Sequence, residues 1–372
     1  MNYSIHTIGL RKTFKNHIEY HRAEKELFSK AKGRFGVETN TKGNEHYAFI
    51  FQGKGIRVIL KKTKISGYYD FILSLNDLLG TEDSSRLIDP RNLNEALDIA
   101  ERMLVCEFGE DYSINALELY RVDQCINVDV GSADNVSEYI NLMYRSEMKK
   151  GYEVLIDDSS DFDSTSSFTV RNKTEGLEVS FYDKKKELAQ RDCVSETAEG
   201  TLRVELRILR RKALEKQTPG CNTNRERVAY CMAASREKIL AMAHSLLLDA
   251  DYYPYKKACA KVRAKVRNKK LRSRMLDMLK LVRKKSSVRK AKEKMFELHP
   301  KLRHEYYNKM INEFESIGVN VVTLDKDSEV KFLPSLFEYQ IKVSRGECHG
   351  VFIKFWQKFY NICFIILTIR NI

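Results

Sequence analysis

Three segments between residues 118 and 209 alternate apolar and polar residues, and this alternation constrains the fold more than any other feature of the chain. The segments read RVDQCIN, LEVSFYDK and LRVELRI. Successive side chains of a strand point to opposite faces, so each segment predicts a strand with one apolar and one polar face. If these strands are neighbours, one face packs under helices and the other gathers Asp123, Tyr182, Glu205 and several cations.

Other stretches predict more strands. Residues 46–62 contain two apolar runs joined by Gly53-Lys54-Gly55, which is a hairpin signal. Residues 68–80 predict another strand, stopped at Gly80, and SFTVRNK predicts one at 167–173. Residues 319–324 form a short apolar stretch after the last expected helix.

Helical periodicity appears in three places. Apolar residues three and four apart predict a helix over 93–108. A second helix is expected over about 135–148, with Asp134 as its N-cap. From about residue 225 to 317 the pattern is mostly helical.

These elements predict an α+β protein in three parts. The first part, residues 1–215, is expected to be an antiparallel-sheet domain. Residues 216–317 are expected to form a basic helical DNA-binding domain. Residues 318–372 are a short segment of unclear role.

Charge is concentrated in the expected helical part. The chain carries a net charge of +14, and residues 256–294 contain 18 Lys or Arg against only Asp277 and Glu293. Such a block usually faces a polyanion, either nucleic acid or an acidic membrane, although it can also be a solvated helical face. Val262, Val266 and Leu271 supply a thin apolar stripe, so we expect a helix that buries little and displays cations around most of its surface.

Several classes of protein are disfavoured. The eight cysteines form no CxxC pair, which indicates free thiols rather than a zinc ribbon or a disulfide framework. The chain has no P-loop, HExxH or GxSxG motif, and the aspartates of residues 157–167 lack the pattern of a calcium loop. The N-terminus has no apolar core of a signal peptide, and the uninterrupted apolar run at 362–369 is too short to cross a bilayer. We therefore expect a cytoplasmic protein with no membrane partner.

The charged strand face suits phosphoryl transfer. Asp123 and Glu205 could hold Mg²⁺ or Mn²⁺, which prefer oxygen ligands. Arginine and lysine offset charge on phosphate oxygens, and the Tyr182 hydroxyl could attack phosphorus to form a phosphotyrosine. The alternative is structural, because antiparallel sheets commonly carry Arg–Glu pairs across neighbouring strands.

Three blocks at these positions resemble a known family. They are Arg121-Val122-Asp123, Tyr182-x-Lys184-x-x-Glu187 and Arg203-Val204-Glu205-x-Arg207-Ile208. In this order they resemble the filamentous-phage gene II and X-type replication initiators and their plasmid and prophage relatives. The resemblance covers roughly residues 45–215. Those proteins start rolling-circle replication by nicking one DNA strand at an origin.

The resemblance implies a role for each matching residue. Tyr182 is the expected nucleophile, with Lys184 and Arg203 as catalytic partners. Asp123, Glu205 and Glu187 are the candidate ligands of Mg²⁺ or Mn²⁺, because the chain lacks the His–hydrophobe–His metal site of the wider nickase class. Arg121 and Arg207 are expected to bind DNA. Six further DNA-binding residues are expected from charge alone, and they are Lys261, Arg263, Lys265, Arg267, Lys269 and Lys270.

Two other functions stay open. The runner-up is a non-catalytic DNA-binding regulator of phage or plasmid replication that has the same fold. A third possibility is an RNA- or membrane-associated basic protein. An initiator without an ATP site would need origin DNA as its substrate and a host helicase to separate the strands.

Overall fold

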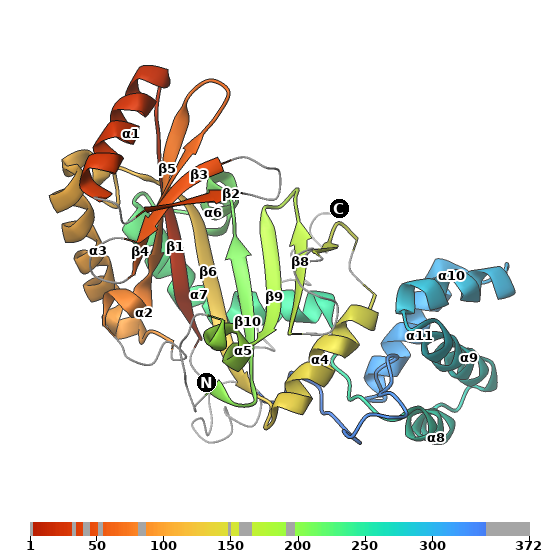
Figure 1. Ribbon diagram of the computed structural model, residues 1–372. Helices are drawn as coiled ribbons and strands as arrows, with labels where there is room; N and C mark the ends of the chain where they lie inside the picture. The colour runs from red at the N-terminus through yellow and green to blue at the C-terminus, as the bar shows by residue number, and fades with distance from the viewer. Residues whose placement is uncertain are drawn as a thin grey trace, which may run out of the picture.

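The computed structural model describes residues 3–31, 35–39, 45–50, 55–80, 87–147, 150–155, 166–190 and 198–339. Within these residues the strands form one antiparallel sheet with the order β2-β3-β4-β5-β1-β6-β10-β9-β8-β7 (Figure 1). The strands are β1 (Tyr3–Thr13), β2 (Phe35–Thr39), β3 (Glu45–Ile50), β4 (Ile56–Lys62), β5 (Gly67–Ser74), β6 (Glu118–Asp129), β7 (Glu153–Leu155), β8 (Ser167–Asn172), β9 (Leu177–Asp183) and β10 (Thr201–Ile208).

Helices pack against the sheet and also form a cluster beside it (Figure 1). They are α1 (His17–Ala31), α2 (Leu75–Leu78), α3 (Leu93–Phe108), α4 (Ala133–Arg145), α5 (Lys184–Ala189), α6 (Arg211–Gln217), α7 (Asn224–Leu246), α8 (Tyr255–Lys265), α9 (Lys269–Lys285), α10 (Val288–Leu298) and α11 (His304–Ser316). The mixed helix and antiparallel-sheet architecture expected from the sequence is therefore present.

One face of the sheet is apolar and packs against helices. Val122 and Ile126 of β6 are fully buried on this face, and Gln124 between them donates a hydrogen bond from Nε2 to the Cys231 carbonyl of α7. Tyr144 of α4 packs edge-on against Phe168 of β8, with ring centroids 4.9 Å apart. The opposite face carries the charged side chains, as the alternation predicted.

The central strand predictions are confirmed. Strands β8, β9 and β10 occupy the expected segments, and β3 and β4 form the expected antiparallel pair, although residues 51–54 between them lie outside the described residues. The strand expected over 68–80 ends at Ser74, because the chain turns there into the short helix α2.

The helix predictions hold with one correction. Helix α3 spans the predicted residues, and Leu93, Ala96, Leu97, Ala100 and Leu104 are buried along one side. The N-cap of α4 is Ser132 rather than Asp134, because the Ser132 hydroxyl accepts the Asn135 backbone N–H.

Helix α7 belongs to the sheet body by its contacts. Val228 and Cys231 are fully buried against the strands, and the buried Ser235 hydroxyl lies 3.3 Å from the Gln124 side-chain nitrogen. Helix α7 follows residue 215, where the sequence predicted a domain boundary, and it packs under β6, β1 and β10. The boundary itself stays a prediction.

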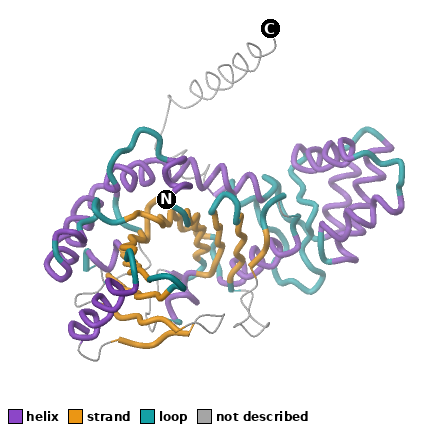
Figure 2. The backbone as a smooth tube through the Cα atoms, turned by 90° about the horizontal axis from the view of Figure 1, so that it is seen from above, coloured by secondary structure: helices purple, strands orange, loops and turns teal. Residues whose placement is uncertain are grey.

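The helices α8–α11 form a cluster that lies beyond α4, away from most of the sheet (Figures 1 and 2). Glu147, just after α4, ties the cluster to the sheet body by pairing with Lys292 at 2.5 Å and accepting the Tyr307 hydroxyl at 3.0 Å. Arg145 at the end of α4 pairs with Asp325 at 2.8 Å.

The basic segment is not a single helix that buries little, so that expectation is wrong. The chain breaks between α8 and α9, and Val262, Val266 and Leu271 are all buried. Met275, Met278, Leu279 and Val282 extend the buried stripe along α9 beyond the three residues expected to form it. These helices therefore bury an apolar side that is continuous with the core of the protein, while their cations occupy the outer surfaces.

The segments at the ends of the chain are described only in part. Residues 319–324 pack against residues 251–254, and Val319 and Val322 are fully buried. The apolar tail 351–369 and most of the polar loop 157–167 lie outside the described residues. In the described part of the chain, no helix combines the length and the apolar character needed to cross a bilayer.

Candidate functional site

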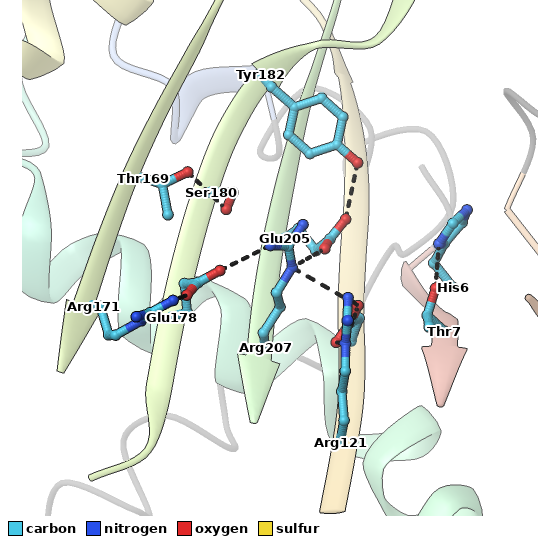
Figure 3. A network of polar contacts seen from close by, with 11 residues as sticks. His6, Thr7, Arg121, Thr169, Arg171, Glu178, Ser180, Tyr182, Glu205 and Arg207 are labelled. Carbon is cyan, nitrogen blue, oxygen red and sulfur yellow. Dashed lines mark hydrogen bonds and ion pairs between the residues drawn. The ribbon is translucent and has the colours of Figure 1, made fainter. Parts of the chain in front are cut away.

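The register of three neighbouring strands builds a charged network on the polar sheet face (Figure 3). In β10, Arg203 is opposite Tyr182, and Arg207 is opposite both Glu178 of β9 and Asp123 of β6. The structure thus brings together Asp123, Tyr182 and Glu205, as the alternation predicted. We call the group formed by Arg121, Asp123, Arg171, Glu178, Tyr182, Glu205 and Arg207 the sheet network.

Tyr182 and Glu205 are directly hydrogen-bonded. The Tyr182 hydroxyl donates to Glu205 Oε2 at 2.9 Å, a diagonal contact between β9 and β10. Burial raises the pKa of Tyr182 well above 10, and the negative charge of Glu205 raises this pKa further, while Arg203 lowers it. Tyr182 therefore keeps its proton near neutral pH in this arrangement, and its oxygen is held at a defined place.

Glu205 is ionised although it is buried. Burial alone would raise its pKa, but Arg207, the nearby His6 and the Tyr182 hydrogen bond lower the pKa to about 2. The closest contact joins Arg207 Nε to Glu205 Oε1 at 2.5 Å. Each carboxylate oxygen of Glu205 therefore has a donor, one from Arg207 and one from Tyr182.

Arg207 is the centre of the sheet network. Its Nη1 donates to Glu178 Oε1 at 2.8 Å, and its Nε lies 3.8 Å from Asp123 Oδ2. Arg171 of β8 completes the row by pairing with Glu178 at 2.6 Å. The Arg207 side chain is 29% exposed while that of Glu178 is 5% exposed, so the guanidinium covers the carboxylate below it.

Asp123 is held by Arg121, which contacts both of its carboxylate oxygens. Burial raises the pKa of Asp123, and the charge of Glu205 adds to this rise, while Arg121 and Arg207 lower the pKa. Two neighbouring buried carboxylates thus differ, since the one closer to Arg207 ionises more easily.

The expected metal ligands do not fit a metal site as they are arranged. The oxygens of Asp123 and Glu205 already accept hydrogen bonds from arginine and tyrosine donors. Glu187 pairs with Lys184 at 2.5 Å. In the described ranges, no three His, Cys, Asp or Glu side chains lie close enough together to hold a metal ion.

Lys184 and Arg203 are both buried beside the tyrosine. Lys184 begins α5, directly after β9, and is 1% exposed. Arg203 is 0% exposed, and its Nε donates to Asn127 Oδ1 at 2.7 Å. Because both side chains are buried, they are placed to hold Tyr182 in position and not to contact a large substrate directly.

His6 belongs to the site although no sequence pattern pointed to it. The pairing of β1 with β6 shifts between Ile5 and Thr7, so His6 is the extra residue of a β-bulge. Its Nδ1 lies 2.7 Å from Thr7 Oγ1, and Figure 3 shows both side chains beside the network. No motif in the sequence marks such a bulge.

A second group of charges lies farther along the same face. Asp70 of β5 pairs with Arg11 at 2.7 Å and with Lys61 at 3.3 Å. The Arg11 guanidinium also stacks between the rings of Tyr68 and Tyr120, at 4.1 and 4.3 Å. Alternation within β1 and β5 would have placed Arg11 and Asp70 on this face.

The six cations of the basic segment that were expected to bind DNA lie in the helical cluster, which Figure 1 shows apart from the strands β6, β9 and β10. Lys265 donates to the Ile317 carbonyl at 2.7 Å, and Lys261 lies 4.5 Å from the Tyr253 ring centroid. The structure does not bring these cations and Tyr182 together. The other four cations of this set are exposed: Arg263, Arg267, Lys269 and Lys270.

Comparisons with known proteins give little support for a family. No family model matches the chain, and no curated protein matches it significantly. One similar solved structure is that of a rolling circle replication initiator protein from Geobacillus stearothermophilus, with 13% identity and a TM-score of 0.27. That match covers 72% of this chain and 90% of the other. A TM-score this low establishes neither a shared fold nor a shared function.

Proposed function

We propose that this protein initiates rolling-circle replication by nicking one DNA strand, with Tyr182 as the nucleophile. The observation that carries the proposal is the 2.9 Å hydrogen bond from the Tyr182 hydroxyl to the ionised Glu205. A nucleophilic hydroxyl needs an adjacent acceptor for its proton, and cations beside the reacting phosphate. Glu205 and the arginines of the sheet network supply both.

The proposed step is a transesterification. The Tyr182 oxygen forms a bond to phosphorus, its proton passes to Glu205, and one phosphorus–oxygen bond of the DNA breaks. The departing DNA oxygen leaves as a hydroxyl after taking up a proton. Because the phosphotyrosine keeps the energy of the ester, the strand can later be rejoined without ATP.

Arg207 supplies a way to activate the pair. Without DNA it holds the pKa of Glu205 at about 2, which makes Glu205 a weak base. A phosphate that draws the partly exposed guanidinium toward itself weakens the contact between Arg207 and Glu205. The pKa of Glu205 then rises, and proton transfer from Tyr182 becomes easier when the substrate is in place.

A requirement for Mg²⁺ or Mn²⁺ stays a prediction from the sequence. Asp123 and Glu205 would have to lose arginine partners before their oxygens could bind a cation. Cleavage that continues unchanged in excess EDTA would contradict the prediction. A host helicase partner likewise stays a prediction.

The second candidate function is a non-catalytic DNA-binding regulator of replication. It is favoured by the raised pKa of Tyr182 and by the complete pairing of Asp123, Glu178 and Glu205 with arginines. In this case the sheet network would only stabilise the fold.

One experiment separates the two functions. The full-length protein is incubated with Mn²⁺ and a supercoiled plasmid that carries its own replicon, and the products are examined in SDS. Nicked circles with attached protein support the initiator. DNA binding without any adduct, under conditions that keep the protein folded, would support the regulator.

A further inference from the structure

A cationic groove lies between the start of α9, the end of α10 and the start of α11, far along the chain from the sheet network. Its volume is about 740 Å³, which is within the usual range for small-molecule sites. Lys270 and Arg274 of α9 form one side, and Lys301, Arg303 and Lys309 form the other. Of these five, only Lys270 was among the residues expected to bind DNA.

In the part of the chain that the structure describes, these five cations lack carboxylate partners. Within the described ranges none of them forms an ion pair, and Glu305 is the one acidic residue that lines the groove. Cations that face one another without counter-charges repel, which an arriving polyanion would relieve. The positive charge of the groove therefore favours an anionic ligand and does not contribute to folding through ion pairs.

The groove also has an apolar part. Leu298, Pro300, Leu302 and Tyr306 line it together with the cations. Leu298 is 53% exposed, whereas Val288, Ala291 and Met295 of the same helix are buried. Aromatic and apolar side chains beside cations are the combination that binds unstacked nucleobases and their phosphates.

We propose that this groove holds a segment of single-stranded nucleic acid, with phosphates on the cations and a base against Tyr306 and Leu298. The proposal deepens the proposed function, because it gives a nicking enzyme a second place to hold the strand, away from Tyr182. The proposal also assigns a role to the apolar residues, which binding through charge alone would not use.

The charge part is tested with two matched triple variants of the full-length protein. Lys301→Gln/Arg303→Gln/Lys309→Gln removes three groove cations. Lys212→Gln/Lys216→Gln/Lys326→Gln removes three exposed cations elsewhere. Binding of a fluorescent 20-nucleotide oligo-dT is measured by anisotropy at several salt concentrations, after thermal melting has shown that both variants are folded.

We expect the groove variant to flatten the salt dependence by about 0.7 for each phosphate that is no longer neutralised, or roughly two units in all. The control variant should leave the slope near that of the wild type. An equal effect of both variants, or no effect of the groove variant, would overturn the proposal.

The base part is tested with Tyr306→Leu and an abasic oligonucleotide of equal length. The wild type should bind oligo-dT about 5- to 150-fold more tightly than the abasic strand, which is the range for one stacked base. In Tyr306→Leu this preference should shrink. Equal binding of both strands by the wild type would contradict the placement of a base in the groove.

The same variants test whether the groove binds a lipid surface instead of nucleic acid. If the groove triple loses binding to phosphatidylserine vesicles but keeps its binding to oligo-dT, the groove faces lipid and the proposal fails. Nicking is measured separately on saturating DNA. A wild type that does not nick but shows groove-dependent DNA binding would end the nickase proposal and leave the groove intact.

Discussion

The sheet network and the helical cluster are both rich in cations, but their charges are arranged in opposite ways. On the sheet, Arg121, Arg171 and Arg207 each pair with a buried carboxylate. In the groove of the cluster, within the described residues, Lys301 and Arg303 have no such partner. Net charge alone therefore does not identify a polyanion site, because pairing decides which cations remain available.

The difference has an energetic consequence. Removing one partner of a buried ion pair leaves an uncompensated charge and costs several kcal/mol. Removing an exposed, unpaired cation changes stability by less than about 0.5 kcal/mol. Substitutions in the two regions should therefore separate effects on folding from effects on binding.

The largest expected effect is on chemistry. Tyr182→Phe removes only the hydroxyl that contacts Glu205, so the covalent protein–DNA adduct and nicking should vanish together while DNA binding survives. SDS gel electrophoresis of the reaction measures the adduct. Tyr230→Phe, at a 40% exposed position on α7, is the matched control and should behave as the wild type. An adduct that persists in Tyr182→Phe would assign the chemistry to another tyrosine.

The next effect is on stability. Arg207→Gln leaves Glu178 and Glu205 without their shared guanidinium, so we expect the free energy of unfolding to fall by roughly 3 kcal/mol. Urea denaturation measures this change. Arg303→Gln in the groove is the control, with an expected change below about 0.5 kcal/mol. Equal losses of unfolding free energy in the two variants would show that paired cations of the sheet and unpaired cations of the groove do not differ in their contribution to stability.

A smaller effect depends on pH. Because the pKa of Glu205 is about 2 in the folded state and 4.5 ordinarily, its charge stabilises the fold above pH 4.5. That contribution is lost as pH falls from about 4.5 toward 2. The raised pKa of Asp123 opposes the trend, so we expect the net loss of stability to be smaller than the shift of Glu205 alone would give.

Glu205→Gln measures this contribution. The variant should be less stable than the wild type near neutral pH, and the difference should shrink as the pH is lowered through this window. Urea midpoints at several pH values give the comparison, with the exposed Glu237→Gln as the control. A difference that stays constant over this range would mean that the Glu205 charge is not what stabilises the fold.

The smallest effect on stability is expected in the basic helices. Changing Lys265, Arg267, Lys269 and Lys270 to Gln should leave the folding free energy nearly unchanged, apart from the hydrogen bond that Lys265 donates to Ile317. The salt dependence of DNA binding should nevertheless flatten by roughly two to four units if most of these residues touch phosphate. Filter binding over a salt series measures the slope. An unchanged slope would restrict the DNA contacts to other parts of the protein.

Much of the fold followed from local patterns. The three alternating segments became β6, β9 and β10, and the apolar spacing of residues 93–108 became α3. The gathering of Asp123, Tyr182 and Glu205 on one face was also predicted, because strand periodicity decides which side chains share a face once strands are neighbours. The basic surplus of residues 256–294 was visible in the sequence as well.

The sequence by itself determined the strands, their charged face and the basic helices, since these depend on residues close together in the chain. The Arg121–Asp123 and Glu205–Arg207 pairs are also local, because their members lie two residues apart on one strand and so share a face. Only the tertiary structure decided that Arg207 also meets Glu178 and Asp123, because those contacts depend on register between distant strands. It also decided that His6 occupies a bulge and that α7 lies under the sheet. The groove also depends on the tertiary structure. One side comes from α9 and the other from the segment before α11 and α11 itself, and only packing of the cluster brings their cations together.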